Sequence, residues 1–243
     1  MMKVQVACLP RDPVAVPAYL AETYWWAYVH PGAVRVFERQ WLVNLILWGN
    51  FSRLRDAALE ALGRRLEGRT LQVACVYGDL TKRLLAKIPE DGQLDVVDVL
   101  PVQLDNLARK LPGGAPVELI HGDSAALAFE SATYDRVLLF FLLHEQPDEV
   151  RRRTIAEALR VVKPGGKLVI VDYHRPHRLN PLYWPMVGIL RTLEPYALDL
   201  WRSELRDWLP EAARAYSSRK QTSFGGLYQL LTITVGESAG RPG

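Results

Sequence analysis

Carboxylates and a hydroxyl stand at the ends of apolar runs, where a nucleoside ligand would need them. Asp98 ends the run LDVVD and lies twenty residues after Gly78, which follows the run LQVACVY. In a doubly wound sheet, a carboxylate at this spacing accepts hydrogen bonds from ribose hydroxyls. Asp123 and Ser124 end a third run, VELIHG, where they could meet an adenine ring. Each signal is weak by itself, since an acidic residue at a strand end is more often a helix cap than a ligand. The predicted nucleoside site comprises Val76, Tyr77, Gly78, Asp98, Val99, Asp123 and Ser124.

Imidazoles and another carboxylate follow two further apolar runs. His144 comes directly after VLLFFLL, and Asp172 and His174 come after KLVIV. Residues just past adjacent parallel strands share one edge of the sheet, and a hard divalent cation accepts carboxylate, imidazole and water. The sequence therefore predicts a metal site at His144, Asp172 and His174, with His144 also catalytic. The alternatives are a histidine that caps the following helix and, for YHRPHR, a solvated basic loop.

A repeated pattern of strand, turn and helix between Leu71 and Tyr173 must position these residues. The expected strands are LQVACVY, LDVVDV, VELIHG, YDRVLLFFLL and KLVIVDY, and the expected helices are Thr81–Lys87, Val102–Leu111 and Asp148–Val162. VLLFFLL and KLVIV are almost continuously apolar, as strands buried on both faces should be. The alternation predicts a mostly parallel sheet with helices on both faces. A hairpin at Gly225-Gly226 adds two antiparallel strands, which completes a seven-stranded Rossmann-like α/β fold.

Composition excludes several classes of protein. The chain has 243 residues, of which 49% are hydrophobic and 23% charged, so it is not wholly disordered, collagen-like or coiled-coil. A formal net charge of +3 is too small to indicate nucleic-acid binding. Cys8 and Cys75 lie far apart, which argues against a disulfide framework or a cysteine zinc site and favours a reducing, cytoplasmic setting. No stretch reaches the ~18–20 apolar residues that cross a bilayer, so we expect a soluble or peripheral protein.

The composition shifts twice along the chain, and the shifts define its expected regions. An amphipathic helix is expected from Arg53 to Gly68, at the end of the first region. The expected regions are a helical cap at 1–68, a Rossmann-like region at 69–236 with an aromatic insertion at 175–210, and a frayed tail at 237–243.

All seven tryptophans lie outside the central core, four before it and three after it. They either pack helices onto the domain or form an apolar pocket or a membrane-facing surface. The run Trp41–Trp48, with Arg35 and Arg39 upstream, is the best candidate for such a surface.

Together with VVKPGGKLVIVD, the motifs from Thr70 to Asp172 resemble those of class I S-adenosylmethionine-dependent methyltransferases, and SFGGLYQLLTIT resembles the hairpin of quinone C-methyltransferases. The elements YWWAYVHP and LHEQPDE are more specific, and they resemble the rhodoquinone biosynthesis family over most of the chain. This resemblance implies conversion of ubiquinone to rhodoquinone. In that reaction S-adenosylmethionine donates an amino group that replaces a ring methoxy group, and manganese (Mn2+) is required.

The chain departs from the parent methyltransferase pattern hh(D/E)hGxGxG in the first turn. In the frame LQVACVYG, Gln72 stands at the acidic position. Ala74 and Val76 replace two glycines, and Gly78 remains. Glycine serves in this turn because a side chain would obstruct the close approach of backbone to ligand. We therefore expect the amino-acid end of S-adenosylmethionine to sit differently, which agrees with a reaction in which that end takes part.

The resemblance also implies roles for residues outside the nucleoside site. Tyr77 and Asp79 are candidate catalytic groups that reach the cofactor's ammonium or the quinone; the alternative is local turn chemistry, with Asp79 capping a helix. Tyr24, Tyr28 and His30 could contact a quinone head group; the alternative is an aromatic helix packed on the sheet. Because ubiquinone is lipid-soluble, the enzyme is expected at the cytoplasmic face of the inner membrane.

Two other functions stay open. A conventional methyltransferase acting on a quinone or another small apolar molecule would fit the core motifs, although the changed turn argues against it. A non-catalytic protein that binds S-adenosylmethionine would also fit, because decay of an active site could likewise remove two glycines.

Overall fold

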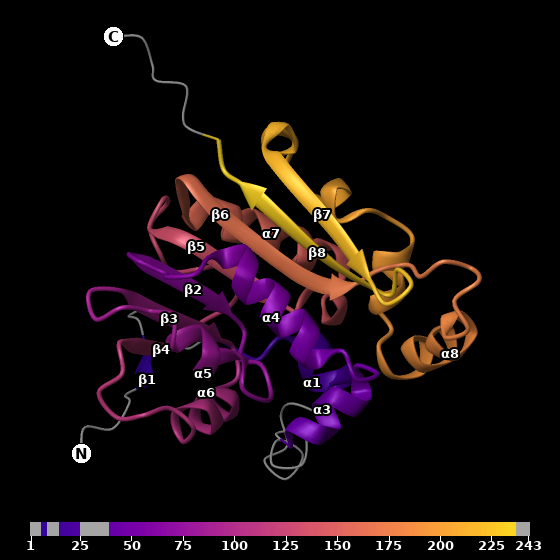
Figure 1. The fold of residues 1–243 in the computed structure, drawn as a ribbon, viewed down its shortest axis with the longest axis horizontal. Helices are drawn as coiled ribbons and strands as arrows, with labels where there is room; N and C mark the ends of the chain where they lie inside the picture. The colour runs from indigo at the N-terminus through magenta and orange to yellow at the C-terminus, as the bar shows by residue number, and fades with distance from the viewer. Residues whose placement is uncertain (1–5, 9–14, 25–38, 237–243) are drawn as a thin grey trace.

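The structure is a computed structural model that describes residues 6–8, 15–24 and 39–236. The strands are β1 (Val6–Cys8), β2 (Arg69–Val73), β3 (Gln93–Asp98), β4 (Val117–His121), β5 (Tyr134–Phe140), β6 (Val162–Tyr173), β7 (Ser217–Ser223) and β8 (Tyr228–Thr234). The described strands form one sheet in the order β1-β4-β3-β2-β5-β6-β8-β7, parallel except where β8 pairs with β6 and β7 (Figure 1). The Rossmann-like methyltransferase fold with a C-terminal antiparallel hairpin is confirmed. β1 adds an edge strand to the seven expected because it pairs in parallel with β4.

Helices cover both faces of the sheet. The α-helices are α1 (Ala18–Thr23), α3 (Gln40–Ile46), α4 (Phe51–Leu62), α5 (Leu80–Leu85), α6 (Pro101–Ala108), α7 (Asp148–Val161) and α8 (Tyr183–Leu193). The 3-10 helices are η2 (Leu143–Glu145), η3 (Ala197–Trp201), η4 (Leu205–Trp208) and η5 (Glu211–Ala215). In Figure 1, α4 crosses in front of the sheet, where it packs on β5, β6 and β8, and α7 lies behind β6. Helices α5, α6 and α7 confirm the three helices expected in the core.

The central strands are buried on both faces, as their apolar sequences predict. Leu138 and Leu139 of β5 and Ile170 and Val171 of β6 have no exposed surface. Burial of one such side chain stabilises the fold by ~1.5–3 kcal/mol. These strands therefore form a rigid platform, and the turns at their carboxyl ends carry the predicted site residues.

The helix expected from Arg53 to Gly68 is shorter than predicted. α4 ends at Leu62 because Gly63 follows it with φ of 140°, a conformation that glycine adopts far more easily than residues with a Cβ. Leu66 was expected on the apolar face of this helix. It is buried in the following loop instead, where its N–H donates to the carbonyl of Lys87 at 2.9 Å.

The aromatic insertion uses its tryptophans in two ways. Trp201 and Trp208 are buried, and the guanidinium of Arg151 lies 4.8 Å from the Trp208 ring. Packing onto the domain therefore accounts for these two residues. Trp184 of α8, by contrast, is 76% exposed. Trp25 and Trp26 lie outside the described residues.

Candidate active site

A cavity of about 670 Å³ opens at the carboxyl ends of β2, β3, β4 and β5, between the turns that follow these strands and the helices α3 and α8. Ligands of doubly wound sheets bind at this edge, and small-molecule sites have volumes of ~300–1,000 Å³. Among the described residues that line the cavity there is no lysine or arginine. The acidic lining residues are Asp98, Asp123, Glu145 and Glu194. The cavity therefore favours a cationic ligand over an anionic one.

The turn after β2 begins with an alanine in a backbone conformation that glycine usually adopts. Ala74 has φ of 71°, a left-handed conformation that costs a residue with a Cβ ~1–2 kcal/mol. Gln72 stabilises this turn, because its Nε2 donates to the carbonyl of Ala74 at 2.9 Å and its Oε1 accepts from Thr81 Oγ1 at 3.0 Å. The residue at the acidic position of the parent pattern is thus neutral, and its amide is hydrogen-bonded within the protein.

Gly78 is fixed by packing as well as by conformation. It has φ of 86°, and a Cβ there would lie 3.0 Å from Cζ of Phe51. Val76 and Tyr77, which precede it, line the cavity. The hydroxyl of Tyr77 accepts from Nε2 of Gln103 at 2.8 Å. The predicted exposure of Val76 and Tyr77 to the ligand therefore agrees with the structure, whereas Gly78 lies behind the cavity wall.

Asp79 does not line the cavity. Its two carboxylate oxygens accept from Arg55 Nη1 and Arg83 Nε, each at 2.6 Å. Partial burial alone would raise the pKa of Asp79, but these two guanidinium groups hold it below its usual range. Asp79 stands at the N-cap position of α5 without a side-chain capping bond. The structure thus gives it neither the predicted catalytic position nor the alternative capping contact.

Asp98 occupies the predicted ribose position at the end of β3. Its Oδ2 accepts from the N–H of Cys75 at 2.7 Å and its Oδ1 from the N–H of Leu100 at 2.8 Å. Burial raises the pKa of Asp98 to about 6, although both N–H groups act against this rise. The side chain of Cys75 also bonds to this carboxylate, and a carboxylate has about four acceptor positions, so at least one remains for a ribose hydroxyl. Asp98 therefore ties the β2 and β3 turns together and still faces the cavity.

The remaining nucleoside candidates also line the cavity. Val99, Asp123 and Ser124 are all part of its wall. Asp123 Oδ1 accepts from the N–H of Ala125 at 2.8 Å, and Ser124 Oγ accepts from Gln146 Nε2 at 3.0 Å. These contacts orient the ends of β4 and β5 relative to each other.

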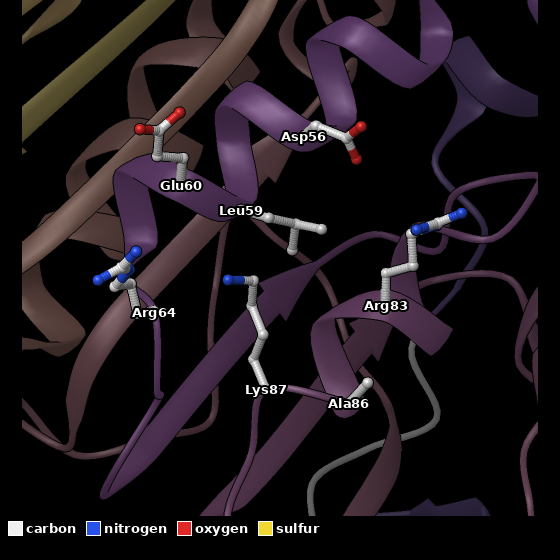
Figure 2. A pocket seen from close by; sticks show the side chains of 7 residues that line it. All are labelled: Asp56, Leu59, Glu60, Arg64, Arg83, Ala86 and Lys87. Carbon is white, nitrogen blue, oxygen red and sulfur yellow. The ribbon is translucent and has the colours of Figure 1, made fainter.

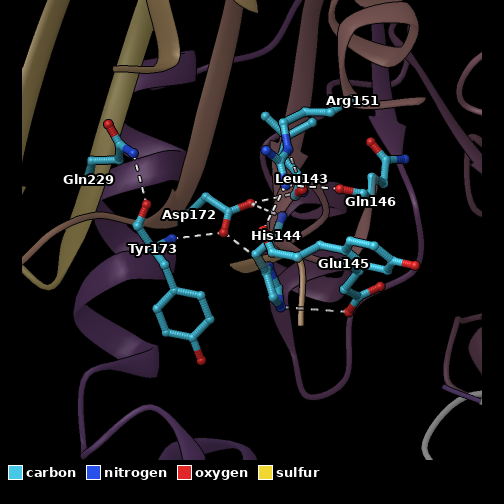
Figure 3. A network of polar contacts seen from close by, with 9 residues as sticks. Leu143, His144, Glu145, Gln146, Arg151, Asp172, Tyr173 and Gln229 are labelled. Atoms are coloured by element: carbon cyan, nitrogen blue, oxygen red, sulfur yellow. Dashed lines mark hydrogen bonds and ion pairs between the residues drawn. The ribbon is translucent and has the colours of Figure 1, made fainter. Parts of the chain in front are cut away.

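His144 lies in η2 at the end of β5 and joins the cavity to a buried polar network (Figure 3). Its Nδ1 is 3.0 Å from Oδ1 of Asp172. Its ring meets the ring of Tyr173 edge-on, with centroids 4.9 Å apart. Burial alone would lower the pKa of His144, but the carboxylates of Asp172, Glu194 and Glu145 raise it to about 9. The imidazole is therefore held as a cation at neutral pH.

Arg151 holds the backbone that carries His144. It is fully buried, its Nε donates to the carbonyl of Leu143 at 2.8 Å, and its Nη2 donates to the carbonyls of Gln146 and Tyr196, both at 2.9 Å (Figure 3). Three carbonyls from two separate segments thus converge on one guanidinium. Arg151 is a positioning residue, which sequence reasoning missed because it begins the charged run RRR.

Glu194 was also missed. It follows α8 as its C-cap residue, where the helix dipole disfavours a negative charge, and this unfavourable placement is the signal that could have identified it. Burial raises the pKa of Glu194, although His144 and Tyr24 lower it. Tyr24 is itself buried and lies outside the cavity lining, so it supports Glu194 rather than facing the ligand. Tyr28 and His30, the other two predicted quinone contacts, lie outside the described residues.

Of the three predicted metal ligands, the structure brings His144 and Asp172 together, with His144 Nδ1 3.0 Å from Asp172 Oδ1. The described residues contain no group of three His, Cys, Asp or Glu side chains that could hold a metal ion. Asp172 Oδ2 accepts from the N–H groups of Leu143 and His144, and Oδ1 accepts from the N–H of Tyr173. His174 lies elsewhere, with Nδ1 2.7 Å from the carbonyl of Gly226. These residues do not fit the manganese that the resemblance implies, because Asp172 serves the backbone and His144.

A second hollow, between α4 and α5, has a different character (Figure 2). Its lining is Asp56, Leu59, Glu60, Arg64, Arg83, Ala86 and Lys87. Charges of both signs lie around it, and Lys87 Nζ already donates to the carbonyl of Gly63. None of the predicted site residues lines it, so the cavity at the strand ends is the better candidate.

Comparison with known proteins agrees with this geometry. Residues 70–166 match the family described as a methyltransferase domain. This match covers less than half of the chain. The matched segment contains all the predicted nucleoside residues and His144.

Two kinds of relative extend the comparison. The chain is 28% identical to a demethylmenaquinone methyltransferase of Bacillus licheniformis over 182 residues, which cover 73% of this chain and 76% of the relative. Its fold is similar to the solved structure of a SAM-dependent methyltransferase from Aquifex aeolicus, with a TM-score of 0.52, 17% identity and coverage of 85% and 98% of the two chains. It is also similar to an O-methyltransferase family protein from Burkholderia thailandensis, with a TM-score of 0.61, 18% identity and coverage of 85% and 60%. The two solved structures therefore share the fold of this chain.

Proposed function

We propose that this protein uses S-adenosylmethionine to transfer a group to the ring of a lipid-soluble quinone. The observation that carries the proposal is the dual character of the cavity. Its inner wall has four acidic side chains and no described lysine or arginine, whereas its outer wall is formed by apolar side chains of α3 and α8. A sulfonium nucleoside fits the acidic part by charge, and an isoprenoid quinone fits the apolar part.

Several residues would hold S-adenosylmethionine. Asp98 would accept hydrogen bonds from the ribose hydroxyls, and Asp123 and Ser124 would contact the adenine, because all three residues line the cavity. The cofactor supplies an electrophilic methyl group on its sulfonium and a nucleophilic amine on its amino-acid end. Val76 and Tyr77 narrow the space for that end. Val76 places a side chain where the parent pattern has glycine, and the side chain of Tyr77 also lines the cavity.

His144 would bind the quinone ring oxygen. Its Nε2 is 3.8 Å from the nearest carboxylate oxygen, on Glu145, and so can donate to a ligand, while Nδ1 faces Asp172. In amino transfer, negative charge would develop on a ring oxygen as an enolate when the amine adds to the quinone, and a fixed cation aimed at that oxygen stabilises the transition state. In methyl transfer, the quinol would react as its aryl oxide, and the cation would favour that reactive form by stabilising its negative charge.

The relatives support methyl transfer, because those from Bacillus licheniformis and Bacillus subtilis are demethylmenaquinone methyltransferases. The changed first turn favours the second candidate, amino transfer in rhodoquinone formation. Ala74 keeps the left-handed backbone of a glycine. However, Val76 adds a side chain where the parent pattern has glycine, and Gln72 replaces its acidic residue with a neutral amide. A pocket altered around the amino-acid end fits a reaction in which that end donates the group. Its amine would add to the methoxy-bearing ring carbon, and methanol would leave. The ring would then take up an electron pair as the Cα–N bond becomes an imine, and hydrolysis would release a 2-oxo acid and leave the nitrogen on the reduced ring.

Product analysis tests the proposal. The purified chain is incubated with S-adenosylmethionine and short-tailed ubiquinone or demethylmenaquinone analogues, each as quinone and as quinol, and the extracts are examined by mass spectrometry. The expected result is a ring-modified product that requires both reactants and increases with enzyme concentration. Saturable binding of S-adenosylmethionine without a modified ring in any of these mixtures would refute the proposal and favour the non-catalytic alternative.

A further inference from the structure

Exposed apolar side chains gather on two helices beside the cavity. Among the described residues, nine large hydrophobic side chains are exposed, and all except Val16 belong to α3, α8 or the residues next to them. We call these eight the apolar rim: Trp41, Leu45, Ile46, Trp48, Leu179, Trp184, Ile189 and Leu193. We propose that the apolar rim docks this protein on an anionic lipid bilayer. No described helix is long and apolar enough to cross a membrane, so the contact is with the bilayer surface.

Both helices expose large apolar side chains, whereas a surface helix normally exposes polar ones. On α3, Trp41 and Leu45 are 62% and 64% exposed, and on α8 Trp184 is 76% exposed. Leu179, just before α8, is 97% exposed. A contiguous apolar surface of this kind marks an interaction site, and tryptophan is the side chain that favours the headgroup region of a bilayer.

The apolar rim is continuous with the cavity. Leu45, Ile46, Trp48, Ile189 and Leu193 are both exposed and part of the cavity lining. The helices α3 and α8 lie beyond the carboxyl ends of the parallel strands (Figure 1), and Trp48 Nε1 donates to Met186 Sδ at 3.2 Å between them. An apolar molecule could thus pass from a bilayer into the cavity without crossing water. This consequence rests on the proposed quinone substrate, whereas docking itself does not.

Charge identifies the partner as an anionic surface. Residues 39–48 and 175–193 contain four arginines and no Asp, Glu or Lys. These arginines are Arg39, Arg175, Arg178 and Arg191, and all are exposed. None of these four arginines forms an ion pair with another described residue. A bilayer with anionic headgroups pairs with such arginines, each contributing ~1 kcal/mol near the surface.

A second copy of the chain is a poorer partner for the apolar rim. A symmetric dimer through this face would bring both sets of four arginines together, and opposed like charges disfavour association. A bilayer offers acyl chains to the tryptophans and phosphates to the arginines at once.

Flotation with lipid vesicles tests docking. The full chain is mixed with vesicles of phosphatidylglycerol and phosphatidylethanolamine, or of phosphatidylcholine alone, and centrifuged through a density gradient. The expected result is flotation with the anionic vesicles that weakens at least tenfold in Leu179→Ser/Trp184→Ser and in Arg178→Glu/Arg191→Glu. The matched control Arg64→Glu/Arg153→Glu makes the same charge change on other exposed arginines and should float like the wild type.

Three results would overturn docking. They are no flotation of the wild type, equal loss in the control and the rim variants, and a concentration-dependent dimer that Leu179→Ser/Trp184→Ser converts to monomer. Flotation needs no turnover, so a protein that floats but modifies no quinone would refute the proposed function and leave docking intact.

Discussion

Replacement of His144 by glutamine tests the role of the buried cation in the cavity. Glutamine can still donate a hydrogen bond from its side-chain amide, but it carries no charge and does not titrate. In the proposed reaction, the active form is the imidazolium, which the carboxylates around it favour. The variant therefore removes the cation while it keeps a polar group of similar size.

The magnitude follows from the structure. The rise in the pKa of His144 from 6.5 to about 9 corresponds to about 3 kcal/mol of preference for the cation. Loss of one donor aimed at a developing oxyanion lowers kcat by about 10²–10³-fold in other enzymes. We expect His144→Gln to lower kcat by a factor in this range.

The assay is the pH dependence of kcat between pH 6 and 10.5 with a soluble quinone analogue. Because the raised pKa keeps His144 protonated below it, wild-type kcat should be constant at neutral pH and fall as pH rises through about 9. In His144→Gln this alkaline fall should vanish. His174→Gln is the matched control, since His174 lies outside the cavity and bonds to Gly226; it should retain kcat within about twofold.

The reasoning is refuted by a His144→Gln variant that folds, by circular dichroism and thermal melting, and retains wild-type kcat. It is equally refuted by an alkaline fall that persists in the variant. A large loss of kcat in His174→Gln would instead support the predicted metal set, in which His174 is a ligand.

Three further predictions concern the walls of the cavity. Gly78→Ala should destabilise the fold by ~1–3 kcal/mol more than Gly114→Ala, measured by urea unfolding, because both glycines have left-handed φ but only Gly78 lies against Phe51; equal losses would contradict this. Asp98→Asn should raise the KM for S-adenosylmethionine about tenfold, and wild-type KM should rise as pH falls through about 6, where Asp98 gains a proton; a pH-independent KM would contradict the ribose role. Arg151→Lys should lower the free energy of unfolding by at least ~2 kcal/mol and lower kcat with little change in KM, because the lysine side chain cannot reproduce the hydrogen bonds of Arg151 to three carbonyls. If the folded variant regains wild-type kcat at low temperature, Arg151 contributes to stability alone.

The sheet could be predicted because its strands carry a strong local signal. The runs VLLFFLL and KLVIV are buried on both faces, and their length and continuity distinguish them from surface strands. The position of Asp98 at the cavity was predictable from its spacing to Gly78, since that spacing is set by one helix and the strand that follows it. β1 escaped prediction because three residues carry too little periodicity to indicate a strand.

The arrangement of the polar groups was harder to predict. Sequence places Asp172 at a strand end, but a carboxylate there can bind a cation or accept backbone N–H groups, and only the contacts show that it does the latter. Glu194 comes from an insertion with no repeating pattern, and Arg151 is indistinguishable by type from its exposed neighbours Arg152 and Arg153. Their roles depend on tertiary contacts between segments distant in the chain.

The fate of two labels tests the central claim most directly. S-adenosylmethionine that carries 13C in its methyl group and 15N in its amino group is incubated with the protein and a quinone. Separate mixtures contain ubiquinone, whose ring carbons are all substituted, and the quinol of a demethylmenaquinone analogue, which has a free ring carbon. Each quinone product is weighed by mass spectrometry. The proposed function predicts that the ring gains one of the two labels, and the altered turn at Ala74 and Val76 predicts that the label is 15N. A ring that gains 13C would establish methyl transfer and refute the inference from the turn. A ring with neither label would contradict transfer from S-adenosylmethionine altogether.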